Sequence, residues 1–271
     1  MLRRESWLAY YRDKNCRMTE QLSQAKNLAE RLLGIALDVV HEARITLDQD
    51  WARNPKVVGL TLLSRSMTNF RAAMVLLYDQ HVHTIEARVL ARCIYENLLW
   101  IAALRERGAD FVKDMLKDEA FNRQAIGTLA LELSKKSRGD VDDEAALMLR
   151  ELIRSTNKEF PGSKKLSANN IARGTSFETA YVEYSRLSLD AVHCSVTALG
   201  RHLSREVEDK ETFLTVNVHP TAAPKEVLDT LIVLCRGLLG VTIGANELLG
   251  GTSKNESLRT LSDELDAILV P

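Results

Sequence analysis

Three charged residues within one predicted helix are the first candidates for chemistry. Arg88, Arg92 and Glu96 are spaced four residues apart, and at 3.6 residues per turn they share an arc of about 80°. Apolar residues occupy the same arc, and buried charge without a partner is unfavourable. Because Glu96 can relieve mainly Arg92, Arg88 needs another partner. Two interpretations follow: an internal ion-pair network that fixes helix register, or a polar pocket that binds an anion such as a phosphate.

A second predicted helix, residues 177–204, supplies further polar groups. Tyr181 and Tyr184 fall on its apolar side, and a buried phenol normally finds a hydrogen-bond partner. We therefore expect the two tyrosines to meet the three charged residues in an internal polar cavity that binds a ligand. His193 follows Asp190 by three residues on the opposite side, and histidine is suited to proton transfer near neutral pH. His193 is the candidate catalytic residue, with a solvated or interface histidine as the alternative.

Established catalytic and cofactor motifs are missing from the sequence. It contains no G-x-x-x-x-G-K-[ST], G-x-G-x-x-G, H-E-x-x-H or G-x-S-x-G pattern. His81, His83 and Glu86 offer metal-ligand atoms, but their spacing rarely makes a site alone. The four cysteines are each more than ten residues apart, which is typical of buried thiols in a reducing compartment. We expect no metal, no cofactor and a cytoplasmic protein.

The composition is that of a globular protein. Hydrophobic residues make up 45% and charged residues 27% of the 271 positions, and the formal net charge is −1. No basic excess drives sequence-independent phosphate binding, so a role with nucleic acid stays open rather than favoured. The apolar stretch 85–104 contains four charged residues, which makes it a poor membrane span. We expect no membrane association.

The spacing of apolar residues predicts an all-α fold, a single-domain bundle of about eight or nine helices over residues 1–271. Residues 85–104 are apolar all the way round a helical wheel, which is typical of a helix in the middle of a bundle. Residues 134–176 are expected to form a mobile, charged insertion. Residues 205–223 form the longest predicted non-helical connection, with a short extended piece. The helices are expected at residues 4–14, 17–49, 55–79, 82–107, 109–137, 141–159, 177–204, 224–249 and 255–268.

Two segments carry a resemblance to a known family. Residues 86–96 read E-A-R-V-L-A-R-C-I-Y-E and residues 181–195 read Y-V-E-Y-S-R-L-S-L-D-A-V-H-C-S. Together they resemble a broad bacterial family of unknown function, over about residues 55–203. That family is similar, at a distance, to the HEPN helical domains of bacterial defence and toxin–antitoxin systems. The R-x-x-x-x-H motif of the HEPN ribonucleases does not occur in this chain.

These observations leave two classes of function. The first is a non-catalytic helical binding or interaction module, in bacterial stress or phage defence as the resemblance implies, that binds an anionic small molecule or a nucleotide. The alternative is a HEPN-like hydrolase or ribonuclease that uses the arginines, Glu96 and His193 on RNA or a nucleotide. We also expect a two-fold homodimer, the commonest symmetric form. Apolar and aromatic residues near the chain start favour this association: Trp7, Leu8, Tyr10 and Tyr11.

Overall fold

The computed structural model confirms the all-α class. It describes residues 2–46, 51–79, 83–138, 144–173, 175, 177–192, 199–208, 211–217, 222–251 and 253–269, without the side chains of residues 2–16, 207, 208, 211 and 269. Of these residues 83% are helical. The main helices are α1 (Leu2–Glu42), α2 (Pro55–Tyr78), α3 (Thr84–Arg107), α4 (Ala109–Arg138), α5 (Glu144–Glu159), α6 (Ala168–Ala172), α7 (Glu178–Leu187), α9 (Pro224–Leu249) and α10 (Asn255–Leu269).

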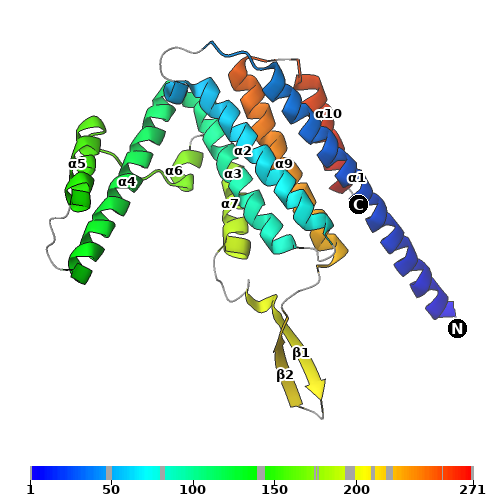
Figure 1. Ribbon diagram of the computed structural model, residues 1–271. Helices are drawn as coiled ribbons and strands as arrows, with labels where there is room; N and C mark the ends of the chain where they lie inside the picture. The colour runs from blue at the N-terminus through cyan, green and yellow to red at the C-terminus, as the bar shows by residue number, and fades with distance from the viewer. Residues whose placement is uncertain are drawn as a thin grey trace.

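Helices α3 and α9 form the centre of the bundle, with α2, α1, α10 and α7 around them (Figure 1). The two central helices run parallel in a fixed register. Thr84 bonds Glu226, Arg88 bonds Thr230 and Arg105 bonds Glu247, each pair 142 residues apart. The prediction that the 85–104 stretch is central is confirmed, because twelve residues of α3 are buried.

Small residues let α9 approach α3 closely. A Cβ atom at Gly240 would lie 2.9 Å from Leu98, and one at Gly244 would clash with Ile101. Among the described residues, α9 is the one helix long and apolar enough to cross a membrane, and 67% of its most apolar window is buried inside the bundle. The apolar character of α9 therefore matches its central packing.

Helix α2 follows the predicted apolar stripe. Asn54 caps its start, because its side chain accepts hydrogen bonds from the backbone N–H groups of Lys56 and Val57. Leu63, Met67, Phe70 and Leu77 of the stripe are buried. Leu60 and Met74 are partly buried.

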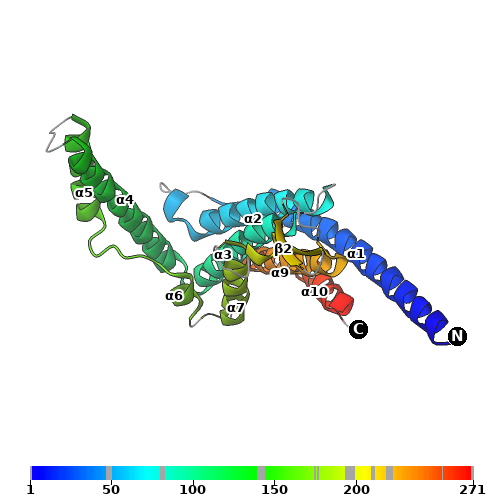
Figure 2. The same ribbon diagram turned by 90° about the horizontal axis from the view of Figure 1, so that it is seen from below.

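The α4–α5 hairpin stands off the bundle as an arm, which Figure 2 shows on the side opposite the free end of α1. Phe111 and Val112 near the start of α4 are buried with Leu99 and Leu104 of α3, and they anchor the arm. The expected insertion at 134–176 thus contains the end of α4, helix α5 and helix α6.

Two predicted helix boundaries are wrong. The helices expected at 4–14 and 17–49 are one continuous helix, α1, since residues 14–17 contain neither proline nor glycine. The helix expected at 177–204 ends as α7 at Leu187 and passes into a π-helical turn, η2 (Ser188–Val192). The Ser188 hydroxyl donates to the Tyr184 carbonyl at 2.9 Å, a side-chain bond that competes with regular helix geometry.

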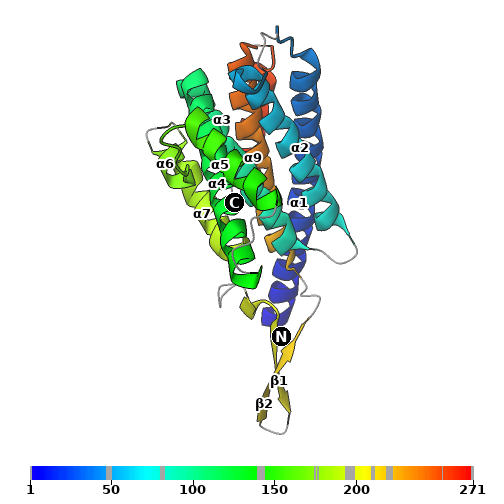
Figure 3. The same cartoon turned by 60° about the vertical axis from the view of Figure 1, so that its left-hand side comes forward.

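The extended piece expected within 205–223 is present and begins earlier than predicted. Strand β1 (Leu203–Glu208) pairs antiparallel with β2 (Glu211–Val216), with Leu203 opposite Val216. Figure 3 shows this β-hairpin projecting from one end of the bundle. Alternation is limited to short pieces, such as Leu214, Thr215 and Val216 of β2, and β-branched residues with high strand propensity occur in both strands: Val207, Thr212, Thr215 and Val216.

Candidate functional site

Arg88 lies at the junction of α3, η2 and α9. Its Nη1 donates to Asp190 Oδ2 at 2.6 Å, and its Nε donates to Thr230 Oγ1 at 3.0 Å. Glu226 Oε1 lies 3.6 Å from the same Nη1. The partner that the sequence required for Arg88 is therefore a pair of acids from two other elements.

Arg92 lies one turn further along α3 and faces α7. Its Nη1 donates to Glu96 Oε2 at 3.1 Å, its Nη2 donates to the Tyr184 hydroxyl at 2.6 Å, and its Nε lies 3.3 Å from Ser188 Oγ. Burial lowers the pKa of Arg92, but Glu96 and Tyr184 more than offset that effect and leave the pKa raised. Arg92 therefore stays charged.

Tyr181 lies beside this cluster and outside its hydrogen bonds. Its ring stacks on that of Tyr184 with 6.0 Å between centroids, and it packs with the cluster that anchors α4. The structure thus brings Arg92, Glu96 and Tyr184 into direct contact and adds Tyr181 through its ring. His193, the candidate catalytic residue, lies outside the described residues.

Three network members were not identified from the sequence. Arg201 donates to Asp190 Oδ1 at 2.5 Å and to Glu226 Oε1 at 3.0 Å. Thr230 accepts from Arg88 and donates to the Glu226 carbonyl at 2.7 Å. Glu226 and Thr230 are four residues apart at the start of α9. This spacing indicates that they share one face of the helix, but it does not indicate which other helix that face contacts.

The resulting network is electrically balanced. Arg88, Arg92 and Arg201 face the carboxylates of Glu96, Asp190 and Glu226, and each guanidinium has a carboxylate oxygen within 3.1 Å. These distances match the first interpretation of the α3 charges, an internal ion-pair network. Because it joins α3 to η2 and α9, the network fixes the register of the central helices.

A groove opens beside the network between α3, α7 and α9. Its volume is about 560 Å³, and Arg88 is the one predicted site residue among those that line it. Tyr95 also lines it and is only 5% exposed. Burial raises the pKa of Tyr95, Glu183 raises it further, and Arg236 and Arg186 oppose the shift. The Tyr95 phenol is therefore a neutral hydrogen-bond donor at physiological pH.

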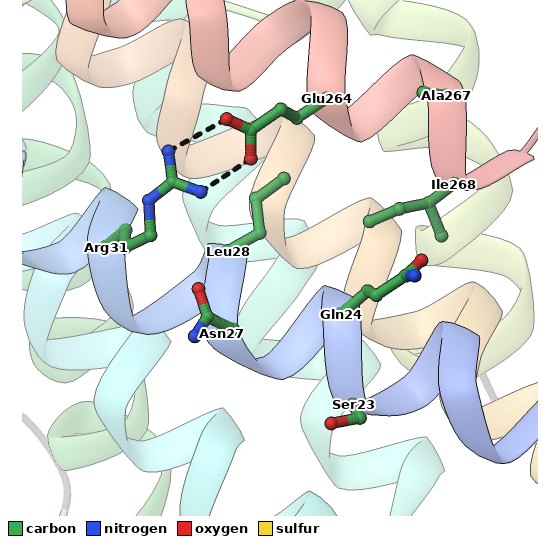
Figure 4. Close-up of a pocket in the computed structure, with 8 residues that line it drawn as sticks. All are labelled: Ser23, Gln24, Asn27, Leu28, Arg31, Glu264, Ala267 and Ile268. Atoms are coloured by element: carbon green, nitrogen blue, oxygen red, sulfur yellow. Dashed lines mark hydrogen bonds and ion pairs between the residues drawn. The ribbon is translucent and has the colours of Figure 1, made fainter.

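A second hollow of about 470 Å³ lies between α1 and α10 (Figure 4). Arg31 closes one end through two hydrogen bonds to Glu264, at 2.6 and 2.9 Å. Its remaining lining is small or neutral: Ser23, Gln24, Asn27, Leu28, Ala267 and Ile268. Arg31 and Glu264 are the two charged residues that line the hollow, and they bind each other. The hollow is therefore a weaker candidate for a ligand site than the α3–α7–α9 groove.

The outer surface of the α4–α5 hairpin is unusually apolar. Ile126, Leu129 and Leu133 follow three- and four-residue spacing along α4, and Met148 and Leu152 are four apart on α5. All five are more than half exposed. We call these five residues the hairpin stripe. Exposed apolar residues that repeat along one face of a helix are typical of interaction surfaces.

Comparison with known proteins gives a family and no function. No curated protein and no solved structure matches the chain. One family model, described as a family of unknown function (DUF5677), matches residues 56–211, which span α2 to the start of β2. The match includes the hairpin stripe and the network residues of α3 and η2, but not Glu226 and Thr230 of α9. Since the match covers more than half of the chain, the protein belongs to the DUF5677 family.

Proposed function

We propose that the protein is a non-catalytic helical interaction module that works through the hairpin stripe. One observation carries the proposal: Ile126, Leu129, Leu133, Met148 and Leu152 are exposed on an arm that stands away from the bundle. A pair of helices has one layer and cannot cover its own outer face, so a second layer is needed to bury it. Apolar surface removed from water contributes about 25 cal/mol per Å².

The partner that fits the stripe is a second copy of this chain. Two antiparallel hairpins placed face to face form a four-helix bundle, a stable arrangement with a shared apolar core. The same patch then serves both subunits, as two-fold symmetry requires.

The biological role of the module is inferred from the family resemblance of residues 86–96 and 181–195. That resemblance favours a cytoplasmic role in bacterial stress or phage defence, as a dimeric scaffold rather than a nuclease. The hydrolase alternative requires His193 beside the arginines. Arg88 and Arg92 are engaged by Asp190 and Glu96, so the described geometry favours a structural role for these two arginines.

The test is the mass of the full chain in solution, by sedimentation velocity at micromolar concentration. We expect the wild type to have twice the 30.4 kDa chain mass, and Ile126→Glu to have the mass of one chain, because it buries two carboxylates in the paired stripe. Val182→Glu is the matched control, since Val182 on α7 is 68% exposed and Ile126 is 70% exposed. It should behave as the wild type.

Two results would overturn the proposal. A monomeric wild type would show that the hairpin stripe does not bind a second copy of this chain. A dimer that survives Ile126→Glu would place the interface elsewhere, such as the predicted N-terminal residues Trp7, Leu8, Tyr10 and Tyr11, whose side chains are outside the description.

A further inference from the structure

Tyr95 is a buried residue whose hydroxyl has no hydrogen-bond partner among the described residues. Tyr95 is 5% exposed and lines the α3–α7–α9 groove, and its hydroxyl makes no hydrogen bond to any described residue. Because this hydroxyl oxygen is not one of the fully buried unpaired atoms, it is accessible to solvent although the rest of the residue is buried. The Tyr95 hydroxyl is thus a donor that faces the groove and is free to bind a molecule there.

Charges of both signs lie beside this phenol: Glu183 has the largest electrostatic effect on Tyr95, and Arg236 and Arg186 oppose it. Arg186 and Arg236 line the groove at the level of Tyr95, on α7 and α9. Arg186 donates through Nε and Nη2 to the partly buried carboxylate of Glu183, at 2.6 Å for the shortest bond. Arg236 is held at 3.0 Å by the exposed carboxylate of Asp266. An exposed pair such as Arg236–Asp266 contributes little to stability, so Arg236 can exchange Asp266 for a bound anion.

The groove changes from charged to apolar along its length. Asp229, the other acid of the lining, lies seven residues before Arg236 on α9, which is about 10 Å along a helix. The opposite end is formed by Leu98 of α3, Phe177 before α7 and Gly240 of α9. A Cβ at Gly240 would lie 2.9 Å from Leu98, so the glycine lets Leu98 pack directly on the backbone of α9 at this end of the groove.

We propose that this groove binds a small organic anion, with its acid group held by Tyr95, Arg236 and Arg186 and its apolar body against Leu98 and Phe177. The groove volume of about 560 Å³ falls within the range of about 300–1,000 Å³ typical of small-molecule sites. A carboxylate or a phosphate ester on an aromatic or aliphatic body has the required shape and charge. The site lies on a different surface from the hairpin stripe and does not depend on it.

The experiment measures binding of benzoate to the full chain by ligand-detected NMR, with benzamide as the neutral ligand of equal shape. We expect benzoate to bind and benzamide to bind at least about tenfold more weakly, because the charge-assisted hydrogen bonds are lost. Tyr95→Phe and Arg236→Gln should each weaken benzoate binding about fivefold to tenfold. Arg31→Gln is the matched control, since Arg31 is 48% and Arg236 is 47% exposed and each pairs with one carboxylate. It should leave benzoate binding unchanged.

Thermal unfolding separates a binding role of Tyr95 from a structural one. Tyr95→Phe should keep the wild-type midpoint, because no described hydrogen bond is lost. A large fall in the midpoint, or equal binding of benzoate and benzamide, would overturn the proposal, as would unchanged benzoate binding in both groove variants. Ile126→Glu should still bind benzoate, so a failure of the dimer proposal leaves this one standing and the reverse also holds.

Discussion

The polar network of α3 and the hairpin stripe of α4–α5 reverse the usual distribution of side chains. In the network, Arg88 and Arg92 are mostly buried among charged partners. In the stripe, Ile126 and Leu129 lie in water. The inner charges are matched among themselves within hydrogen-bond distance, which makes them structural, whereas the outer apolar groups stay more than half exposed in the described part of the chain. The candidate for an intermolecular role is therefore the apolar arm and not the arginine cluster.

The largest effect is expected from removing a network charge. Arg88→Ala should lower the free energy of unfolding by about 3 kcal/mol, because it leaves Asp190 and Glu226 short of a cation in a poorly hydrated place. Arg105→Ala, on the same helix, should lower it by about 1 kcal/mol or less, since its pair with Glu247 is more exposed. Urea denaturation of both variants measures the difference. Equal losses would mean that the network contributes no more than a surface pair.

An intermediate effect is expected in the hairpin, and it depends on protein concentration. In the wild type, amide hydrogen exchange over residues 126–136 should slow about tenfold or more as concentration rises through the dimer range, because association stabilises the paired arm. Mass spectrometry of exchanged peptides measures this change. In Ile126→Glu the exchange rate should be independent of concentration. If exchange in the wild type is also independent of concentration, the hairpin stripe does not mediate association, and the contrast between the stripe and the α3 network is lost.

The smallest effect is expected at the α1–α10 edge, where a charge pair lies in solvent. Arg31→Ala should cost about 0.5 kcal/mol or less, because Arg31 and Glu264 are 48% and 40% exposed. The hydrogen bond from Arg31 is the main cause of a pKa of Glu264 below its ordinary value of 4.5. The pair's contribution is therefore present above that value and is lost as pH falls through the lowered pKa. Thermal midpoints of wild type and variant should converge in acid, and a gap that widens there would contradict this assignment.

Local pattern was sufficient for most helices. Helix α9 begins at Pro224 and ends before Gly250, both as expected from proline in the first turn and a left-handed glycine after the last. The pattern failed at Ser188, where a side-chain hydrogen bond to the Tyr184 carbonyl accompanies the change from α-helix to π-helix. The same kind of bond occurs within regular helix at Ser66 and Thr242, so the residue type alone does not predict the change.

The sequence by itself determined that the chain is helical, that α3 is central and that Arg88 needs a partner beyond its own helix. Only the tertiary structure decided that the partners are Asp190 and Glu226, which are 102 and 138 residues further along the chain. It also decided that Tyr95 faces a groove and that Ile126 faces water. Helical periodicity specifies which residues share a face, because that depends on rise and turn within one element. The neighbour that a face meets depends on how distant elements pack, and that is a property of the whole chain.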